Sequence, residues 1–399
     1  MKRRILVSAG DPSGDLLLSK VISTLLEKAR AEGHELEFVG LAGDRCEQAG
    51  VKLLARSEEV AVVGLAEVLS KLRTIFGVLR KLTDELDSCD SVICVDFPDF
   101  NFKLAEAAGK KNKPVDYLVA PQMWAWRGNR LAKMRRLVRR VYPVLPFEES
   151  FLKQSGIDAR YLGHPLRDVL PPRARRTSRE TLGLKEEDFL IAILPGSRRS
   201  EIKRHLPILV RAWDVFSREA ARRHFPQRFR VQIPLAKGFD LDTLRSFLGS
   251  KDLELFESFL ASQEWRINRE SWLTMQAADF GWIASGTATL EAAYYQLPHL
   301  LFYRLSWLSA RMIDSMTPYF SSTGGMAGLP NILLEKRVIP ELLQNDLTPS
   351  RLAMETIELL GNSIKMISIK RSLRWIPKKL GEANVSVRLS DDLWTLWGF

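Results

Sequence analysis

The sequence is poor in cysteine and histidine. Its 399 residues include three cysteines, Cys46, Cys89 and Cys94, and none has the spacing of a CxxC or Cys/His metal site. The five histidines show no paired spacing. A disulfide-rich secreted fold is therefore excluded, a reducing, cytosolic compartment is favoured, and the residues predict no metal site.

Long apolar runs are also missing. No run approaches the roughly 18 residues that cross a bilayer, and Met1-Lys-Arg-Arg leads straight into a predicted strand. We therefore expect neither a secretory signal nor a transmembrane anchor. The net charge of +11 suits nucleic acid, an anionic membrane surface or phosphorylated small molecules. No helix-turn-helix, zinc-finger, RRM or KH pattern is present, so we expect no nucleic acid partner.

Short apolar segments alternate with helical patterns along most of the chain. The predicted strands cover residues 4–9, 36–41, 92–95, 115–119, 141–145, 190–194, 230–234 and 280–284. This alternation predicts an α/β fold with doubly wound parallel sheets. The length favours two domains, and the stretch 166–180, with two prolines and five arginines, is typical of a linker. Two such domains would place a ligand cleft between them.

The most informative stretch is 91–101. Val92–Val95 has the composition of a strand buried on both faces, and it ends at Asp96, before Pro98. Ligands of open α/β sheets bind beyond the carboxyl ends of the strands, so Asp96 is a candidate catalytic acid or base, with Asp99 and Asn101 behind it. The alternative is that Asp96 caps the following helix.

Three more turns follow predicted strands. Gly10-Asp-Pro-Ser-Gly-Asp15 precedes a helix predicted from residue 16, and Ser13 and Asp15 are candidates to bind a polar ligand there. The alternative is that one of them only caps the helix. Gly196-Ser197-Arg198 offers a close backbone approach, a hydroxyl and a guanidinium at a helix start, which suits a phosphate. Ser285-Gly286-Thr287 repeats the arrangement, and Glu291, one helical turn on, is placed to accept from ribose hydroxyls. Capping is the alternative for each turn; together they suggest a nucleotide diphosphate.

One predicted helix, 64–82, combines an apolar stripe with basic residues. We select membrane-contact candidates from its centre: Leu69, Leu72, Arg73, Ile75, Phe76, Leu79 and Arg80. A basic amphipathic helix suits a membrane surface, although most amphipathic helices only cover a core.

Taken together, these stretches resemble the lipid-A-disaccharide synthase family, inverting glycosyltransferases of the two-domain GT-B type. The resemblance covers about residues 5–345. Its markers are Ala9-Gly-Asp-Pro-Ser-Gly-Asp15, Phe38-Val-Gly-Leu-Ala-Gly43, Val63-Gly-Leu-Ala-Glu-Val68, Asp96-Phe-Pro-Asp-Phe-Asn101, Trp124-Ala-Trp126, Leu145-Pro-Phe-Glu148, Gly163-His164, Leu194-Pro-Gly-Ser-Arg198, Ser285-Gly-Thr287 with Leu290-Glu291, and Leu329-Pro-Asn-Ile-Leu333.

The resemblance implies a reaction. The family joins UDP-2,3-diacylglucosamine to 2,3-diacylglucosamine 1-phosphate, giving a β-1,6 disaccharide and UDP, with no cofactor. Asp96 matches the family's proposed general base. Arg198 and Asn331 match residues implicated in activity or in UDP binding, and Glu291 matches the carboxylate expected at the ribose. The acylated acceptor implies a peripheral enzyme at the cytoplasmic face of the inner membrane, in contact with its phospholipids. The oligomeric state stays open, with a homodimer as one candidate.

The resemblance also implies domain limits. We expect a first domain over residues 1–168, to which the C-terminal helices, about 372–399, cross back, and a UDP-sugar domain over 169–371. Two departures stand out: the family's AGEASGD is AGDPSGD here, which questions a direct role for Asp11, and the loop 321–328 is unusually rich in glycine. The alternative function is another UDP-sugar enzyme of this fold, either with a different acceptor or a UDP-sugar epimerase.

Overall fold

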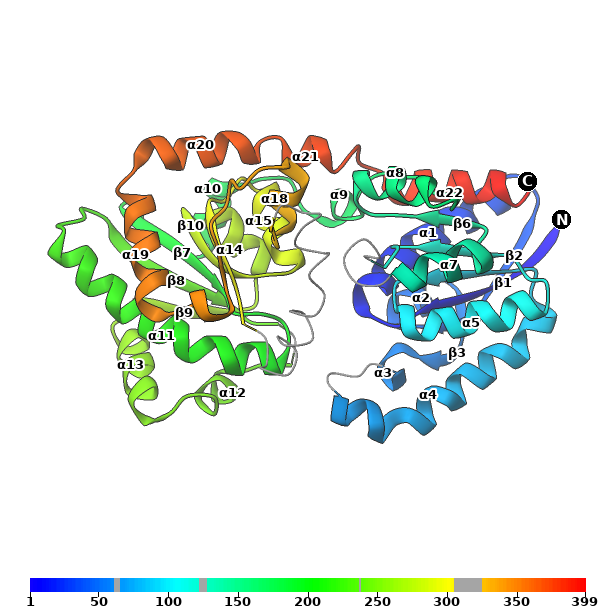
Figure 1. Cartoon of the computed structure of the whole chain (residues 1–399), viewed down its shortest axis with the longest axis horizontal. Helices are drawn as coiled ribbons and strands as arrows, with labels where there is room; N and C mark the ends of the chain where they lie inside the picture. Colours follow the sequence, from blue (N-terminus) through cyan, green and yellow to red (C-terminus); the bar gives the residue numbers. More distant parts are fainter. Residues whose placement is uncertain (61–64, 122–127, 237, 305–324) are drawn as a thin grey trace. The chain divides into compact units, whose positions relative to one another are not determined.

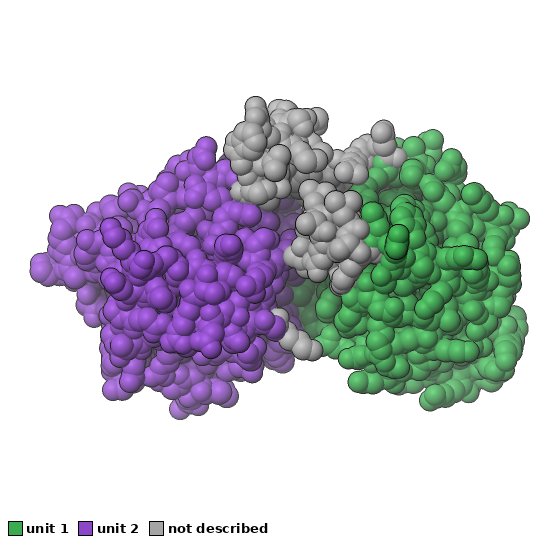
Figure 2. Space-filling view, turned by 90° about the horizontal axis from the view of Figure 1, so that it is seen from below, with its two compact units in different colours: residues 1–169, 380–399 green, residues 170–379 purple. Residues whose placement is uncertain are grey.

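The computed structural model describes residues 1–60, 65–121, 128–236, 238–304 and 325–399, without the side chains of 65–71, 128 and 129. The chain divides into two compact units, coloured in Figure 2. Unit 1 holds Met1–Val169 and Leu380–Phe399, and unit 2 holds Leu170–Lys379. The first boundary between the units lies after Val169, one residue later than predicted. The chain returns to unit 1 at Leu380, whereas the prediction was about residue 372.

Unit 1 is built on a parallel sheet, which in the described residues has the strand order β3-β2-β1-β4-β5-β6. The strands are β1 (Lys2–Ala9), β2 (Glu35–Ala42), β3 (Val51–Arg56), β4 (Ser91–Val95), β5 (Val115–Leu118) and β6 (Arg140–Tyr142). The helices are α1 (Pro12–Ala31), α2 (Asp44–Gln48), α3 (Ser57–Val60), α4 (Leu65–Glu85), α5 (Pro98–Lys110), α7 (Gly128–Leu137), α8 (Pro146–Gln154), α9 (Leu166–Val169) and α22 (Val385–Leu396), with a 3₁₀ turn η1 (Leu86–Ser88).

Helices cover both faces of this sheet (Figure 1). On one face, α1 and α22 pack against alternate residues of β1 such as Ile5 and Val7. On the other face, α4, α5 and α7 pack against residues such as Leu6 and Val92. Covering on both faces explains why the strands are almost continuously apolar, because every side chain of a central strand is buried.

Unit 2 repeats the plan, with the strand order β12-β11-β10-β7-β8-β9 among the residues described. The strands are β7 (Asp188–Leu194), β8 (Arg228–Pro234), β9 (Trp265–Asn268), β10 (Phe280–Ala284), β11 (His299–Tyr303) and β12 (Glu341–Leu343). The helices are α10 (Arg175–Thr181), α11 (Arg199–Arg222), α12 (Leu241–Arg245), α13 (Ser250–Ala261), α14 (Ser271–Ala277), α15 (Thr287–Tyr294), α18 (Leu329–Leu334), α19 (Pro349–Leu360), α20 (Ser363–Leu373) and α21 (Ile376–Lys379), with a 3₁₀ turn η2 (Gln344–Asp346).

Both sheets therefore have the same topology. The first strand of each unit lies centrally, and the chain fills one side of the sheet and then the other. The direction reverses between β1 and β4 in unit 1 and between β7 and β10 in unit 2. In open α/β sheets ligands bind at this reversal, beyond the carboxyl ends of the strands. The turns after β1, β4, β7 and β10, which sequence analysis singled out, are the turns at these two reversals.

Some sequence expectations need correction. The strands β3, β9, β11 and β12 were not predicted. The stretch 166–180 is not simply a linker, because it contains α9 and most of α10. Arg175 and Arg179 of α10 pair with Asp279, which directly precedes β10, and these ion pairs hold the arginine-rich segment against unit 2. The arginines that suggested an exposed linker are therefore partly used in packing.

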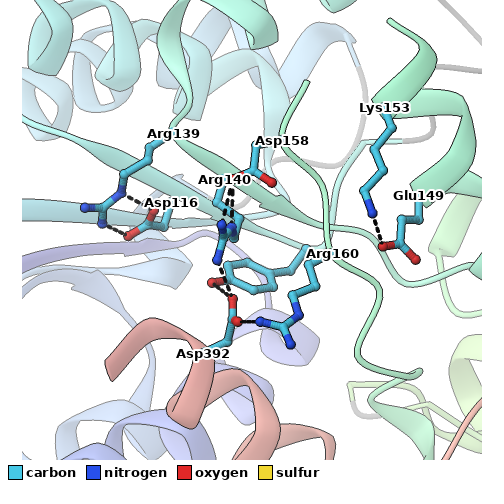
Figure 3. A network of polar contacts seen from close by, with 9 residues as sticks. Asp116, Arg139, Arg140, Glu149, Lys153, Asp158, Arg160 and Asp392 are labelled. Atoms are coloured by element: carbon cyan, nitrogen blue, oxygen red, sulfur yellow. Dashed lines mark hydrogen bonds and ion pairs between the residues drawn. The ribbon is translucent and has the colours of Figure 1, made fainter. Parts of the chain in front are cut away.

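The C-terminal helix α22 is anchored in unit 1 by a buried carboxylate (Figure 3). Asp392 accepts from the Tyr142 hydroxyl at 2.7 Å and from Arg140 at 3.1 Å, and it also pairs with Arg160. Trp397 donates its indole N–H to Asp116 at 3.1 Å, and Asp116 also binds Arg139. These contacts fix the returning chain on the strands β5 and β6.

We expect Asp392→Ala to lower the free energy of unfolding by about 2 kcal/mol, because two arginines and a buried hydroxyl lose their acceptor. Asp391→Ala is the matched control. Asp391 is half exposed and pairs only with Lys28, so its loss should cost under about 0.5 kcal/mol. Urea unfolding measures both, and equal midpoints for the two variants would contradict this role of Asp392.

Candidate functional site

Asp96 lies directly beyond the carboxyl end of β4 in a strained backbone. Asp96 and Phe97 have φ of 42° and 48°, the left-handed region that side chains with a Cβ rarely adopt. The helix α5 begins at Pro98 and receives no side-chain cap, so the capping alternative for Asp96 is not what the structure shows. Consecutive strained residues persist only where the surroundings hold them, and they cluster at functional sites.

Two side chains hold this turn through the carbonyl of Asp96. The Asn101 side-chain N–H donates to it at 2.8 Å, and the Tyr117 hydroxyl donates at 2.6 Å. Asn101 is fully buried, and its side-chain oxygen accepts from the Ser8 hydroxyl at 2.6 Å. Gly10 leaves room beside the turn, because a Cβ there would lie 2.5 Å from the Phe97 ring. Asn101 is therefore a positioning residue for Asp96, and its predicted contact with substrate stays a prediction.

Asp96 has the electrostatics of a general base. Burial raises the pKa of its carboxyl to about 6, and the neighbouring charge of Asp11 contributes to that rise. Ala9 of β1 pairs with Val95 of β4, so the turns that carry Asp11 and Asp96 start side by side. A carboxylate with a pKa close to neutrality accepts a proton efficiently and still ionises at neutral pH.

Sequence analysis questioned a direct role for Asp11, but its charge acts on the carboxyl of Asp96. It is also the N-cap of α1: its carboxylate accepts from the N–H of Ser13 and Gly14 and from the Ser13 hydroxyl. The cap expected from Ser13 or Asp15 therefore comes from Asp11 instead. The order of the strands, which places β1 beside β4, is the signal that could have identified Asp11.

The remaining acceptor-binding candidates occupy different environments. Ser13 is exposed at the start of α1. Asp15 is buried, and its carboxylate accepts from the N–H of Gly43, Arg45 and Cys46, which holds the turn between β2 and α2. Asp99 is exposed and pairs with Arg130 at 2.6 Å. Ser13 and Asp99 therefore remain open to a ligand, whereas the carboxylate of Asp15 is engaged in the fold.

In unit 2, the turn after β7 combines Gly196, Ser197 and Arg198 at the start of α11. Gly196 has φ 125°, and a Cβ there would lie 2.8 Å from Glu201. Glu201 folds back over this glycine and accepts from the N–H of Ser197 at 3.2 Å and of Arg198 at 3.3 Å. The Arg198 guanidinium donates to Glu201 at 3.0 Å and is largely exposed. A carboxylate therefore occupies the anion-binding amides of this turn.

The turn after β10 lies beside it in the sheet, since Ile283 of β10 pairs with Leu194 of β7. Gly286 has φ 147° and is the N-cap of α15, without a side-chain cap. Ser285 is half-buried, and Gly286 and Thr287 are exposed. Two adjacent turns, one with exposed residues and one whose amides already bind a carboxylate, suit a diphosphate.

Glu291 lies one turn along α15. Burial raises the pKa of its carboxyl, and the indole N–H of Trp272 donates to it at 3.1 Å. Asn331 behaves differently: it is buried, donates to Ile339 and Glu341, and accepts from the N–H of Val338 and Ile339. Asn331 thus holds the chain after α18, and its predicted contact with UDP stays a prediction.

The predicted membrane helix is α4, and the apolar candidates with described side chains are half-buried apart from Phe76. Ile75 and Leu79 pack against the core of unit 1, and Leu72 is half-buried. Phe76 is exposed by 51%, and Arg73 and Arg80 are exposed. The side chain of Leu69 lies outside the described residues, as do residues 321–324 of the loop 321–328. Of the apolar candidates with a described side chain, Phe76 alone is exposed.

Two further observations concern metals and membranes. The described residues contain no group of three or more His, Cys, Asp or Glu side chains that could hold a metal ion. Asp240, in an Asp-Leu-Asp sequence, caps α12 instead by accepting from Thr243 N–H at 2.8 Å. No helix in the described ranges is long and apolar enough to cross a membrane.

Comparisons with known proteins are consistent with this arrangement. A family described as lipid-A-disaccharide synthetase matches residues 5–388. The lipid-A-disaccharide synthase of Solibacter usitatus is 34% identical over 383 residues, which cover 94% of this chain and 93% of the relative. That of Syntrophus aciditrophicus is 35% identical over 385 residues, with the same coverage.

Solved structures support the fold. A UDP-GlcNAc 2-epimerase from Neisseria meningitidis, bound to UDP-GlcNAc, has a TM-score of 0.59 at 13% identity and covers 99% of this chain and 100% of that one. The calicheamicin glycosyltransferase CalG4 has a TM-score of 0.58 at 15% identity and covers 100% and 98%. At these identities the likeness shows the fold alone, and it confirms the expected α/β class with two Rossmann-like units of GT-B type.

Proposed function

The chain belongs to the lipid-A-disaccharide synthetase family, and from that membership we propose that Asp96 is the general base of its reaction. The protein is a glycosyltransferase of lipid A biosynthesis that forms the lipid A disaccharide from a UDP-sugar donor. The observation that carries the proposal is the strained, half-buried Asp96 at the strand reversal of unit 1, with its pKa near 6.

The proposed substrates are UDP-2,3-diacylglucosamine as donor and 2,3-diacylglucosamine 1-phosphate as acceptor. Asp96 takes the proton of the acceptor 6-hydroxyl while that oxygen attacks the anomeric carbon of the donor. The bond from the anomeric carbon to the UDP oxygen breaks, the configuration inverts, and UDP leaves. Asp96 then returns the proton to solvent, so each turnover forms one disaccharide, one UDP and one proton.

Unit 2 supplies the donor site in this proposal. The amides of Ser197 and Arg198 and the Arg198 guanidinium stabilise the leaving diphosphate, and Ser285–Thr287 contacts it from the neighbouring turn. Glu201 must release the amides that it now occupies, and the Arg198 guanidinium must turn from Glu201 to the phosphates. Glu291 accepts from the ribose hydroxyls. No metal takes part, because these groups supply the positive potential that a cation would otherwise provide.

Peripheral contact with the inner membrane completes the proposal. The exposed Phe76, Arg73 and Arg80 of α4 are the part of the predicted membrane surface that remains available for it. Arginines beside an exposed aromatic ring suit an anionic lipid surface.

The direct test measures UDP release by the purified protein in detergent with EDTA. We expect UDP and disaccharide in equal amounts when both acylated substrates are present, and little UDP without the acceptor. Release that requires a divalent cation would contradict the proposed metal independence, and equal turnover of a deacylated acceptor would contradict the proposed substrates.

The pH dependence of the reaction tests the role of Asp96. Because Asp96 must be ionised to accept a proton, kcat/KM should fall about tenfold per pH unit below a pKa of about 6. Asp11→Asn removes a charge that raises this pKa and keeps a side chain that can cap α1, so the acid limb should move to lower pH. An unchanged limb in the variant would contradict the coupling between the two carboxylates.

A further inference from the structure

The segment α20–α21 of unit 2 has two faces, and both carry apolar residues. Its inner face is formed by Ile369, Leu373 and Ile376, which are all buried. Its outer face carries Ile364, Ile367 and Trp375, with exposed fractions of 81%, 58% and 56%. These three are half of the large apolar side chains recorded as exposed in the described part of the chain. An ordinary surface helix has one apolar face, so the outer face requires a separate explanation.

The outer face is continuous. Ile364, Ile367, Arg371 and Trp375 recur at steps of three and four residues and therefore share one side of a helix. Arg374, at the end of α20, keeps helical backbone angles, and the N–H of Trp375 bonds to the carbonyl of Ser372 at 3.1 Å. Figure 1 shows α20 and α21, in orange to red, along one edge of unit 2.

The same segment is strongly cationic. Residues 361–381 include no Asp or Glu and six cationic side chains, Lys365, Lys370, Arg371, Arg374, Lys378 and Lys379. Lys379 lies 3.7 Å from Glu335, but Lys365, Arg371, Arg374 and Lys378 form no salt bridge with any described residue. Lys378 lies over the Trp375 ring, 5.3 Å from its centroid. The exposed isoleucines and the tryptophan thus lie among six cations, and four of these form no salt bridge within the described part of the chain.

We propose that the outer face of α20–α21 is a docking surface for an anionic phospholipid membrane, carried by unit 2 and separate from α4. Exposed isoleucines insert among acyl chains, a tryptophan lies at the headgroup level, and cations bind lipid phosphates. The inference rests on the membrane contact of the proposed function and adds a second surface to it, and the reaction itself uses none of these residues.

Two other occupants fit the surface less well. A second copy docked face to face would place these cations against the same cations, since such an interface is self-complementary. Nucleic acid would satisfy the charge, but it gives no reason to expose two isoleucines beside the tryptophan. A lipid surface accounts for both the charge and the apolar side chains.

Vesicle sedimentation of the full-length protein tests the proposal. The vesicles are equimolar phosphatidylcholine and phosphatidylglycerol, with pure phosphatidylcholine for comparison. We expect Ile364→Ser/Ile367→Ser/Trp375→Ser and Arg371→Gln/Arg374→Gln/Lys378→Gln each to weaken binding to the anionic vesicles by about tenfold or more. Val387→Ser, which changes an apolar side chain exposed by 41% on α22, is the matched control and should bind like the wild type.

A site-specific probe locates the contact. Cys46, Cys89 and Cys94 are all buried, so an environment-sensitive fluorophore attached to Ile367→Cys reports on α20 alone. Its emission should shift to the blue with anionic vesicles, whereas the same probe at Val387→Cys should not respond. Turnover of both triple variants in detergent should equal that of the wild type, which separates this inference from the proposed reaction.

Three results would overturn the proposal. The first is wild-type vesicle binding by both triple variants with no response at position 367. The second is a dimer, seen by light scattering, that the serine triple variant dissociates. The third is binding of RNA that the glutamine variant loses while vesicle binding is unchanged.

Discussion

Asp96→Asn should lower kcat by about 10²- to 10⁴-fold, the usual contribution of a positioned general base. The asparagine has nearly the same shape as aspartate but accepts no proton at neutral pH. The turn should survive, because it is held by bonds from Asn101 and Tyr117 to the main-chain carbonyl of residue 96, which the substitution does not alter. UDP release under saturating substrates measures the effect.

Asp90→Asn is the control, since Asp90 lies at the opposite end of the same strand. Its carboxylate accepts from the N–H of Arg4 at 2.7 Å, and an asparagine oxygen can do the same. Turnover of this variant should match the wild type. A comparable loss in both variants would mean that changes at β4 disturb the fold, and the assignment of Asp96 as base would fail.

Asp96→Asn should also stabilise the folded protein at neutral pH. The pKa of Asp96 is higher in the folded protein, about 6, than its ordinary value of 3.8, so ionisation is less favourable in the fold than in the unfolded chain. The favourable contribution of this group is present below pH 3.8 and is lost as the pH rises through 6. Asp96→Asn should therefore unfold at a higher temperature than the wild type at pH 8, and this difference should shrink towards pH 4.

Arg198→Ala should reduce kcat/KM by about a hundredfold, the lower range for losing one donor to a developing negative charge. The guanidinium is largely exposed, so its effect is smaller than that of a buried donor. Stability should change little, because Glu201 keeps its bonds from the N–H of Ser197 and Arg198 and from the Tyr303 hydroxyl. The affinity for UDP, measured by calorimetry, should fall in the same variant.

Arg199→Ala provides the comparison for Arg198. The Arg199 guanidinium lies over the Phe247 ring, 4.9 Å from its centroid, so its loss removes the same charge from the same helix start without removing the proposed phosphate contact. We expect at most a few-fold change in kcat/KM. Equal losses at the two positions would indicate a general effect of net charge rather than a contact from Arg198.

The sequence predicted most of the largely buried strands, although it missed β11, which is almost fully buried. Strands such as 92–95 and 280–284 are short runs of mostly apolar residues that end at a turn with proline or glycine, and the structure confirms both. The missed strands β3, β9 and β12 are short or carry charged residues, since they lie at or near sheet edges with part of their surface open to water. Their pairing is set by neighbouring strands, which a local pattern does not record.

The places of the candidate residues in the fold were predictable from the sequence, and their contacts were not; their roles stay predictions. Asp96, Arg198 and Glu291 stand at strand ends or first helical turns, and position along the chain was enough to select them. The hydrogen-bond partners of Asp15 and Asn331 are residues brought close by folding: Gly43 donates to Asp15, and Glu341 accepts from Asn331, so no local sequence pattern indicated that these side chains were engaged. The same is true of Tyr117, which reaches the Asp96 turn from the next strand.

The two faces of α20 illustrate a related limit. Its inner and outer apolar residues together look like an ordinary core helix, and only the exposed fractions separate them. In α4 the exposed fractions reduce the predicted membrane surface, since Ile75 and Leu79 pack against the core.

The most direct test of the account is the affinity of Asp96→Asn for UDP, measured by calorimetry on the preparation used for turnover. If Asp96 acts on the acceptor hydroxyl while unit 2 binds UDP, the dissociation constant should equal that of the wild type although turnover is nearly lost. A dissociation constant that rises in parallel with the loss of turnover would contradict this division of roles.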